Sequence, residues 1–413
     1  MIFSAKLSRY LIVLSIILVA SVIFPEFYSM TFSHSFSSPH VYYSPVKKIF
    51  VKTVSYKREI KRLDSKGNEY TREEFERLTP LFSYRQLLYR NEMPDSIDGI
   101  PIDISLMRLN NIFITIKPTD VYRYTIPLNP LIESEPGRPD LQMPDDFFRI
   151  TDKIEFIQCY SNKVKVKLSK LFNDALVNCG FNFPAKKFFG NPSTRKPFDE
   201  GFFIVDNNNN LFHMKRVKNK PYVKKVILPE GIKIEFIKVM EMNLKEFYGI
   251  VITEDNRLFL LMYDGYKFVE LPSKGFDRKK MKLVFMGNQF YRIISFFAKN
   301  SVATFVTDRN YKLIAENMEK WKTDEDFTVG KIADFIFPFK LEFTDVYNKY
   351  VNFNFTFSNS SFWIINLLFL FLLLFYFKRK RKNFTVSQSV DLIIVLLTGF
   401  YGFIAVLLIK DDD

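Results

Sequence analysis

The residues whose types could support chemistry are few and widely spaced. The chain of 413 residues has three histidines and two cysteines. His34 and His40, with Met30, offer ligands for copper or haem iron, but they lie in a Ser-rich segment without the clustered spacing of a metal site. No phosphate-binding glycine loop, nucleophile elbow or zinc-binding helix motif occurs in the sequence. We therefore expect no cofactor and favour a protein that is not an enzyme.

One acidic turn resembles a metal site more closely. Asp206 and the four asparagines after it place oxygen side chains as in the first half of a calcium loop. Such a loop would need Gly in place of Leu211 and Glu in place of Val217. Because Asn tolerates left-handed backbone geometry, we predict a hairpin turn instead. His213 is then expected on the polar face of the next strand.

Two pairs of reactive side chains leave alternatives open. Cys159 and Cys179 either pair, closing a loop of about 21 residues in an oxidising compartment, or remain two thiols of which Cys159 packs in a strand. Their spacing excludes a CxxC metal or redox motif. Asp145 and Asp146 are interpreted as a cap before buried aromatic residues, because no partner for acid catalysis can be named.

Two apolar segments near the C-terminus determine on which side of a membrane the rest of the chain is expected to lie. Residues 362–377 carry no charge and one strongly polar side chain, Asn366. Five cations follow, namely Lys378, Arg379, Lys380, Arg381 and Lys382, and a second apolar run covers residues 390–409. Because Lys and Arg in short loops stay in the cytoplasm, this pattern predicts a transmembrane helical hairpin over residues 362–409 with a cytoplasmic turn.

The second apolar run contains an acid and two small residues. For Asp391 we expect interfacial water or Lys382 as the partner, rather than a role in a proton relay. Gly399 and Gly402 allow close helix packing. Their neighbour would be the first hairpin helix, an N-terminal anchor or a partner protein.

The N-terminus predicts a third transmembrane helix. Lys6 and Arg9 precede an apolar run at residues 10–24, whose end lacks the small residues that a signal peptidase needs. We therefore expect an uncleaved anchor over residues 1–26, with its N-terminus in the cytoplasm. Residues 26–361 would lie outside, and the hairpin would leave the C-terminus from Lys410 outside as well.

The main domain is predicted to be mainly β. A linker at residues 27–48 leads into a mixed α/β, Pro-rich part at residues 49–200 and a part with repeated hairpins at residues 201–345. A second linker, residues 346–361, precedes the membrane hairpin. The expected fold is a membrane-anchored, mainly β extracytoplasmic domain of propeller-like antiparallel hairpins with a few helices, plus three transmembrane helices.

The repeated part alternates apolar strands with tight acidic turns. These turns lie at residues 206–210, 255–257 and 308–310, and their spacing is typical of propeller blades. Residues 335–343 would close the ring with a strand near residue 49. An open meander or two separate sheets would account for the same pattern.

The charge of the chain helps to define its partners. The formal net charge is +14, but outside the termini the cations are scattered and form no nucleic-acid motif. We therefore expect no nucleic-acid partner. Membrane lipid is the partner that the apolar runs predict.

Long strings in the chain resemble the domain of unknown function 4857 family, a family of Bacteroides-type membrane proteins. They are YTREE at residues 70–74, MPDDFFRITD at 143–152, TRK at 194–196 with DEG at 199–201, and DLII at 391–394 with Gly399 and GFIAV at 402–406. The resemblance implies a bacterial inner membrane and a periplasmic main domain, and it brings no known site residues. It also associates the chain with ABC-type transporters. We expect a non-enzymatic accessory, sensor or adaptor subunit of an inner-membrane complex, the alternative being a membrane-tethered enzyme or glycan-binding propeller.

Overall fold

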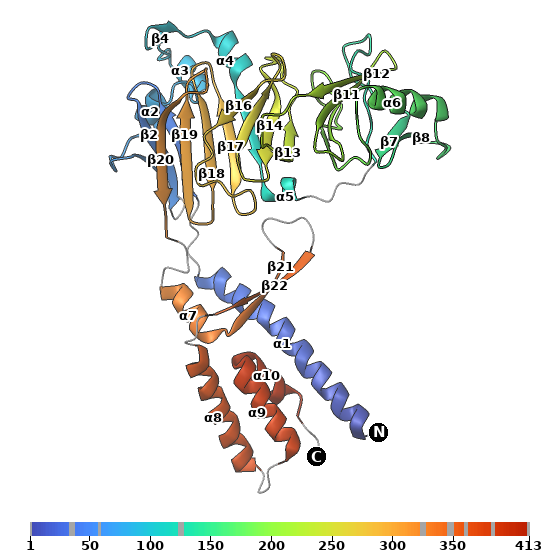
Figure 1. Cartoon of the computed structure of the whole chain (residues 1–413). Helices are drawn as coiled ribbons and strands as arrows, with labels where there is room; N and C mark the ends of the chain where they lie inside the picture. Colours follow the sequence, from blue (N-terminus) through green and yellow to red (C-terminus); the bar gives the residue numbers. More distant parts are fainter. Residues whose placement is uncertain are drawn as a thin grey trace. The chain divides into compact units, whose positions relative to one another are not determined.

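The computed structural model describes residues 2–32, 38–56, 59–122, 128–322, 328–344, 351–358, 362–380 and 385–410. It consists of two compact units, which are described separately (Figure 1). The helical unit contains Met1–Pro39, Val54–Lys61 and Lys320–Asp413. The β unit contains His40–Thr53 and Arg62–Glu319.

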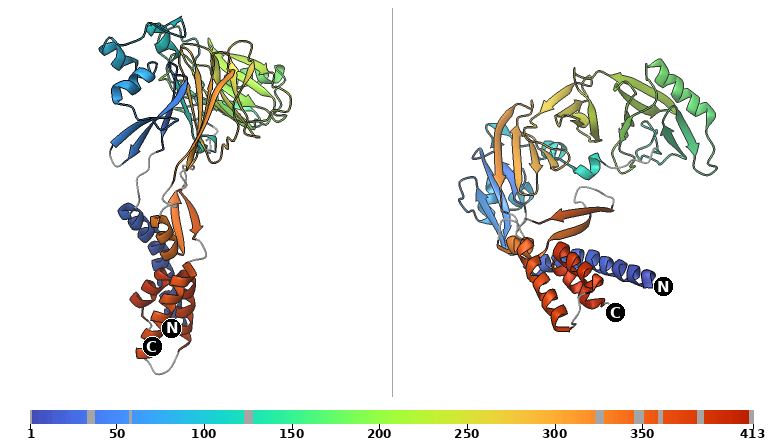
Figure 2. Two further views of the ribbon diagram at one scale, coloured as in Figure 1. Left: turned by 90° about the vertical axis from the view of Figure 1, so that its left-hand side faces the viewer. Right: turned by 60° about the horizontal axis from the view of Figure 1, so that its bottom comes forward.

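Three antiparallel sheets follow one another along the β unit, in an arc that Figure 2 shows from below. The first has the order β12-β11-β10-β9, the second β13-β14-β15-β16 and the third β20-β19-β18-β17-β6. Their strands are β9 (Lys187–Gly190), β10 (Phe202–Val205), β11 (Leu211–Val217), β12 (Lys220–Val226), β13 (Ile234–Val239), β14 (Phe247–Thr253), β15 (Leu258–Met262), β16 (Phe268–Leu271), β17 (Lys282–Gly287), β18 (Arg292–Phe297), β19 (Ser301–Thr307), β20 (Leu313–Lys320) and β6 (Ile112–Ile116).

The core of the β unit lies between these sheets. Every residue of β10 and β14 is buried, because side chains on both faces of these strands meet a neighbouring layer. Phe247 of the second sheet meets Phe285 of the third edge to face, with ring centroids 5.7 Å apart. Tyr248 of the second sheet meets Phe203 of the first in the same way, at 5.5 Å. Aromatic and branched side chains thus join successive sheets.

Smaller elements flank the three sheets. The hairpin of β7 (Asp146–Ile150) and β8 (Ile154–Gln158), with α6 (Val166–Asn178), packs on the first sheet through Phe148, Phe156 and Phe172. The other flanking elements are β1 (His40–Ser44), β2 (Ile49–Tyr56), β3 (Glu59–Asp64), α2 (Arg72–Leu78), α3 (Tyr84–Tyr89), β4 (Ser96–Ile97), β5 (Ile100–Pro101), α4 (Ile104–Asn110) and α5 (Pro118–Val121). Thr71 and Glu74 form a capping box at the start of α2, in which each side chain accepts a hydrogen bond from the other residue's backbone N–H.

The prediction of a mainly β domain with antiparallel hairpins and a few helices is confirmed. The three acidic turns join β10 to β11, β14 to β15 and β19 to β20. The expected ring closure is wrong. β21 (Phe339–Thr344) pairs with β22 (Val351–Phe357) in the helical unit, and β2 pairs with β1 and β3. Within the described residues the hydrogen-bonded sheets do not form a closed ring.

The helical unit contains two helices that are long and apolar enough to cross a membrane. They are the Lys6–Phe32 part of α1 (Ile2–Phe32), and α8 (Phe362–Lys380). Two expected linkers are partly regular structure, because α1 continues through Pro25 to Phe32 and β22 occupies residues 351–357. The short helix α7 (Thr328–Ile336) contributes Ala333 to the core of this unit.

The expected third long helix is wrong. The apolar run at residues 390–409 is divided at Gly399 into α9 (Val386–Thr398) and α10 (Phe400–Leu408). Gly399 has φ 54° and ψ −125°, which interrupts the helix and is accessible to Gly because it has no Cβ. With 13 residues, α9 is about 20 Å long, too short for a bilayer core of about 30 Å.

The chain turns back at Gly399. Arg9 of α1 contacts both Asp391, in the second turn of α9, and the carbonyl of Ile409, just after α10. The end of α10 therefore lies beside the beginning of α9, so the two helices form an antiparallel pair. Lys410 and Lys380 line one pocket and lie at the same end of the helical unit. The expected placement of Lys410 opposite the basic turn is therefore wrong.

Candidate functional site

The most unusual feature of the helical unit is a buried ion pair. Both terminal nitrogens of the Arg9 guanidinium donate to the Asp391 carboxylate, at 3.0 and 2.8 Å, and the two side chains are 8% and 3% exposed. Arg9 Nε also donates to the Ile409 carbonyl at 3.1 Å. The partner expected from the sequence was Lys382 or water, and the structure instead brings Asp391 to Arg9. Lys382 lies outside the described residues.

This contact combines two roles. The last carbonyls of a helix lack intrahelical donors, and Arg9 supplies one to the end of α10. A planar guanidinium can bond both oxygens of a carboxylate, which fixes its orientation more strongly than a single contact does. Arg9 therefore joins α1, α9 and the end of α10.

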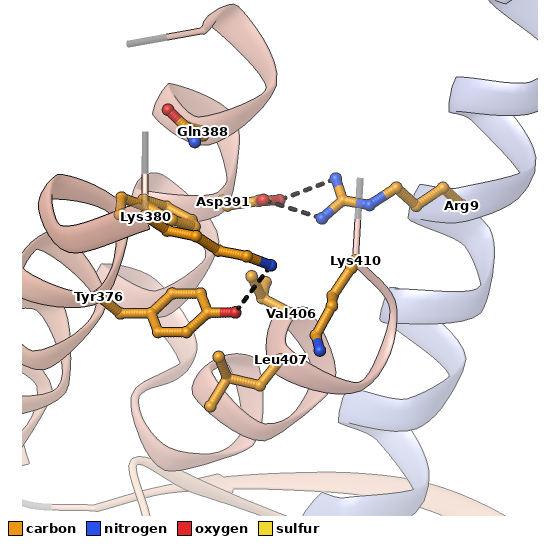
Figure 3. Close-up of a pocket in the computed structure, with 9 residues that line it drawn as sticks. Arg9, Tyr376, Lys380, Gln388, Asp391, Val406, Leu407 and Lys410 are labelled. Carbon is orange, nitrogen blue, oxygen red and sulfur yellow. Dashed lines mark hydrogen bonds and ion pairs between the residues drawn. The ribbon is translucent and has the colours of Figure 1, made fainter. Parts of the chain in front are cut away.

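A pocket of about 40 Å³ lies beside the ion pair (Figure 3). Its polar lining consists of Arg9, Tyr376, Lys380, Gln388, Asp391 and Lys410, and its apolar lining of Phe377, Val406 and Leu407. Lys380 Nζ lies 3.4 Å from the Tyr376 hydroxyl. Gln388 is buried, and its side-chain oxygen accepts a hydrogen bond from the Thr385 N–H at the start of α9. Three cations and one carboxylate thus meet in a small space.

A second polar contact stabilises the turn at Gly399. Asn366 of α8 is fully buried, and its amide nitrogen donates to the Leu396 carbonyl, which the helix break leaves without an intrahelical donor. A Cβ on Gly399 would lie 1.9 Å from the Asn366 side-chain oxygen. A Cβ on Gly402 would lie 2.2 Å from the Thr398 hydroxyl. Of the neighbours expected for Gly399, the structure brings the first hairpin helix against it.

The acidic turn at Asp206 is a hairpin turn, as predicted. The Asp206 carboxylate accepts hydrogen bonds from the backbone N–H groups of Asn208 and Asn210, at 2.9 and 2.8 Å. These hydrogen bonds to the Asp206 carboxylate stabilise the turn. Within the described residues no group of three or more His, Cys, Asp or Glu side chains could hold a metal ion. Met30 and His40 are exposed, and His34 lies outside the described residues.

His213 differs from its expected place. It is fully buried and stacks on Phe203, with ring centroids 4.3 Å apart. Its Nε2 donates to the Glu200 carbonyl at 2.6 Å, so its Nδ1 accepts from the Tyr266 hydroxyl at 2.8 Å. Burial lowers the pKa of His213 to about 3. The prediction of a polar strand face was wrong because aromatic side chains from the second sheet cover β11.

The remaining reactive side chains of the β unit are exposed or paired. Both cysteines are free thiols, and Cys159 is exposed after β8 rather than packed within a strand. Asp146 begins β7, directly before the two aromatic residues of that strand, and it bonds Arg216 at 2.7 Å and Lys165 at 2.8 Å. The hydrogen bond from Lys165 also lowers the pKa of Asp145. Both carboxylates therefore form ion pairs with neighbouring side chains.

Five basic residues were expected to define the turn after α8. Lys378, Arg379 and Lys380 form the last turn of α8 and are exposed. Arg381 and Lys382 lie outside the described residues. The Arg9–Asp391 pair could not be located from the sequence, although Asp391 was singled out as an acid at the edge of an apolar run.

Comparison with protein families identifies a match that covers more than half of the chain. The family model described as Domain of unknown function (DUF4857) matches residues 40–307. No curated protein sequence matches the chain.

Proposed function

Because the chain belongs to the DUF4857 family, whose description assigns no activity, we propose a function from the physical character of the two units. The helical unit anchors the chain in a membrane through α1 and α8, while α9 and α10 enter the same membrane as a re-entrant pair. The β unit is a non-enzymatic accessory, sensor or adaptor module on the extracytoplasmic side. The complex to which it belongs is in a bacterial inner membrane and includes another membrane protein.

The observation that carries this proposal is the outer surface of α1 and α8. Large apolar side chains are exposed on both, namely Leu7, Leu11, Ile12, Leu14, Val19 and Ile23 on α1, and Ile364, Leu367, Leu368, Phe371, Leu372 and Phe375 on α8. Water disfavours such a surface, whereas lipid does not. The polar contacts of this unit, between Arg9 and Asp391 and between Asn366 and Leu396, are inside it.

The break at Gly399 agrees with a position inside a membrane. Non-helical backbone at bilayer depth is tolerated only where protein groups satisfy it. The Gly399 N–H donates to the Val395 carbonyl at 2.7 Å. The Asn366 amide nitrogen donates to the next carbonyl in the chain, that of Leu396. The carbonyls of Val395 and Leu396, just before the break, thus have donors within the protein, whereas the Asn366 side-chain oxygen has no hydrogen-bond partner among the described residues.

Charge supports one orientation. Lys6 and Arg9 precede the apolar part of α1, and Lys378, Arg379 and Lys380 end α8. Both ends therefore belong on the cytoplasmic side, and the β unit belongs on the periplasmic side. Two long helices are too few to build a substrate path, since transporters usually build one from repeated bundles.

The β unit supplies the binding surface. Its three meander sheets pack face to face as propeller blades do, and we propose a propeller-like module. An ABC-type transporter subunit is the partner that the family resemblance suggests. Buried carboxylates of this unit already have partners within it, since Glu241 pairs with Lys196 at 2.6 Å and Asp206 accepts hydrogen bonds from the backbone of its own turn.

Purification of the tagged full-length chain from native membranes in mild detergent tests the adaptor role. We expect a second integral membrane protein at a constant ratio through affinity and size-exclusion steps, and its absence when an unrelated tagged inner-membrane protein is used as the control. A monodisperse chain without partners that turns over a small substrate would contradict the proposal and favour a membrane-tethered enzyme.

A further inference from the structure

The pocket beside Arg9 lies where α1, α8, α9 and α10 come together at one end of the helical unit. We propose that it binds the phosphate group of an anionic phospholipid. This inference rests on the proposed membrane position, because it takes the ligand from the cytoplasmic leaflet in which that end would lie.

The charge balance of the lining favours an anion. Arg9, Lys380 and Lys410 face one carboxylate, Asp391, whose two oxygens are already bonded to Arg9. Within the described residues, Lys380 and Lys410 form no ion pair with a carboxylate (Figure 3). Two ammonium groups thus remain beside a neutralised pair. Basic pockets between membrane helices are suited to anionic lipid headgroups.

The pocket also contains neutral hydrogen-bond donors. Gln388 uses its side-chain oxygen to accept from the Thr385 N–H, so its amide nitrogen is a donor, and no described residue accepts from it. The Tyr376 hydroxyl lies near Lys380 on the same side of the pocket (Figure 3). Charged and neutral donors at one place are suited to the several acceptor oxygens of a phosphate group.

The size and the apolar lining favour a lipid as the source of the phosphate. A volume of about 40 Å³ admits a group of a few heavy atoms rather than a nucleotide or a sugar. Phe377, Val406 and Leu407 line the same pocket, and Leu408 and Phe375 expose apolar side chains nearby in the chain. A phospholipid would place its phosphate against the cations and its acyl chains along these residues. A free phosphate ion would leave the apolar lining without a function.

The test compares two double variants of the full-length chain with equal loss of charge. Lys380→Gln with Lys410→Gln removes both lysines of the pocket. Lys378→Gln with Arg379→Gln removes two exposed cations that lie in the same turn of α8 as Lys380. Neither of them lines the pocket. Each protein is delipidated in detergent, and native mass spectrometry measures binding of phosphatidylglycerol, phosphatidylcholine and inorganic phosphate.

We expect the unmodified chain to bind phosphatidylglycerol in preference to phosphatidylcholine. The pocket variant should bind phosphatidylglycerol about tenfold more weakly, and the control variant within about twofold of the unmodified chain. Equal losses in the two variants, or no loss in either, would overturn the site. Binding of inorganic phosphate that is as tight as that of the lipid, and is lost in the pocket variant, would overturn the lipid as the source.

Carbonate extraction of cell membranes separates this inference from the proposed function. If all three proteins stay in the membrane pellet while phosphatidylglycerol binding does not differ, the lipid site alone is contradicted. Release of the unmodified chain into the supernatant would contradict the membrane anchor and, with it, the lipid site.

Discussion

The two units of this chain place their apolar side chains in opposite ways. In the β unit, side chains such as Leu260 and Phe285 are fully buried between sheets. In the helical unit, Leu368 and Phe371 of α8 are exposed while Arg9 and Asp391 are buried. The β unit therefore buries its apolar side chains, whereas the helical unit exposes apolar side chains and buries a charged pair. This difference is what the proposed function requires, with water as the solvent of the β unit and lipid as the solvent of the helical unit.

The largest loss of stability is expected when one member of the buried ion pair is removed. Asp391→Leu leaves the Arg9 guanidinium buried without its carboxylate, and we expect a loss of about 3–5 kcal/mol in the free energy of unfolding. The double variant Arg9→Met with Asp391→Leu should be more stable than Asp391→Leu alone. Unfolding in mixed detergent micelles measures all three proteins, and a double variant as unstable as the single one would contradict a direct pairing.

Two leucine variants, one in each unit, compare the stability that a buried and an exposed leucine contribute. Leu260→Ala should cost about 3 kcal/mol, because Leu260 is fully buried in the core between the second and third sheets. Leu368→Ala, at a side chain that is 50% exposed, should cost less than about 1 kcal/mol in detergent. Chemical unfolding followed by separate probes in the two units gives both values. Similar costs would show that Leu368 packs against protein rather than lipid.

The pH dependence of the β unit provides a third test. The pKa of His213 is about 3 in the folded chain and about 6.5 when the chain is unfolded, so only the unfolded state gains a proton between these values. Stability should therefore fall as the pH is lowered, by about 2 kcal/mol from pH 7.5 to pH 5. His213→Gln should flatten this part of the profile. An unchanged slope in the variant would assign the dependence to other groups.

The smallest expected effect compares two glycines at positive φ. Gly399 has φ +54° and would place a Cβ 1.9 Å from Asn366, whereas Gly231 of the β unit has φ +73° and open space around it. Both Gly→Ala changes strain the backbone, but only Gly399→Ala adds a steric overlap. We expect Gly399→Ala to cost about 1 kcal/mol more than Gly231→Ala in the same unfolding assay. Equal costs would mean that α8 moves away freely.

The sequence predicted those features that depend on neighbours in the chain. Apolar runs separated by acidic turns at Asp206, Asp255 and Asp308 predicted three hairpins that the structure contains. Thr71 followed by Glu74 is a local signal of the same kind for the start of α2. Each of these signals lies within a few residues, where hydrogen bonds and backbone preferences alone decide the result.

Features that depend on distant residues were missed. Arg9 and Asp391 are 382 positions apart, and nothing in either segment specifies the other. The turn at Gly399 was hidden in a continuous apolar run, because hydropathy does not distinguish one long helix from two short antiparallel ones. Asn366 was a usable signal, since a polar side chain in an apolar helix forms hydrogen bonds across to a neighbouring helix. The pairing of β21 with β22 was missed although the two strands are neighbours in the chain, because residues 346–361 were expected to form a linker.

The proposed placement puts lipid around the helical unit and the β unit on the periplasmic side. The exposed thiol of Cys159 tests it directly in a chain with Cys179→Ser. A membrane-impermeant maleimide should label this thiol in intact spheroplasts, whereas a thiol introduced by Lys378→Cys, in a chain with both native cysteines replaced by Ser, should react only after lysis. Labelling of the thiol at position 378 in intact spheroplasts, with Cys159 protected until lysis, would contradict the account.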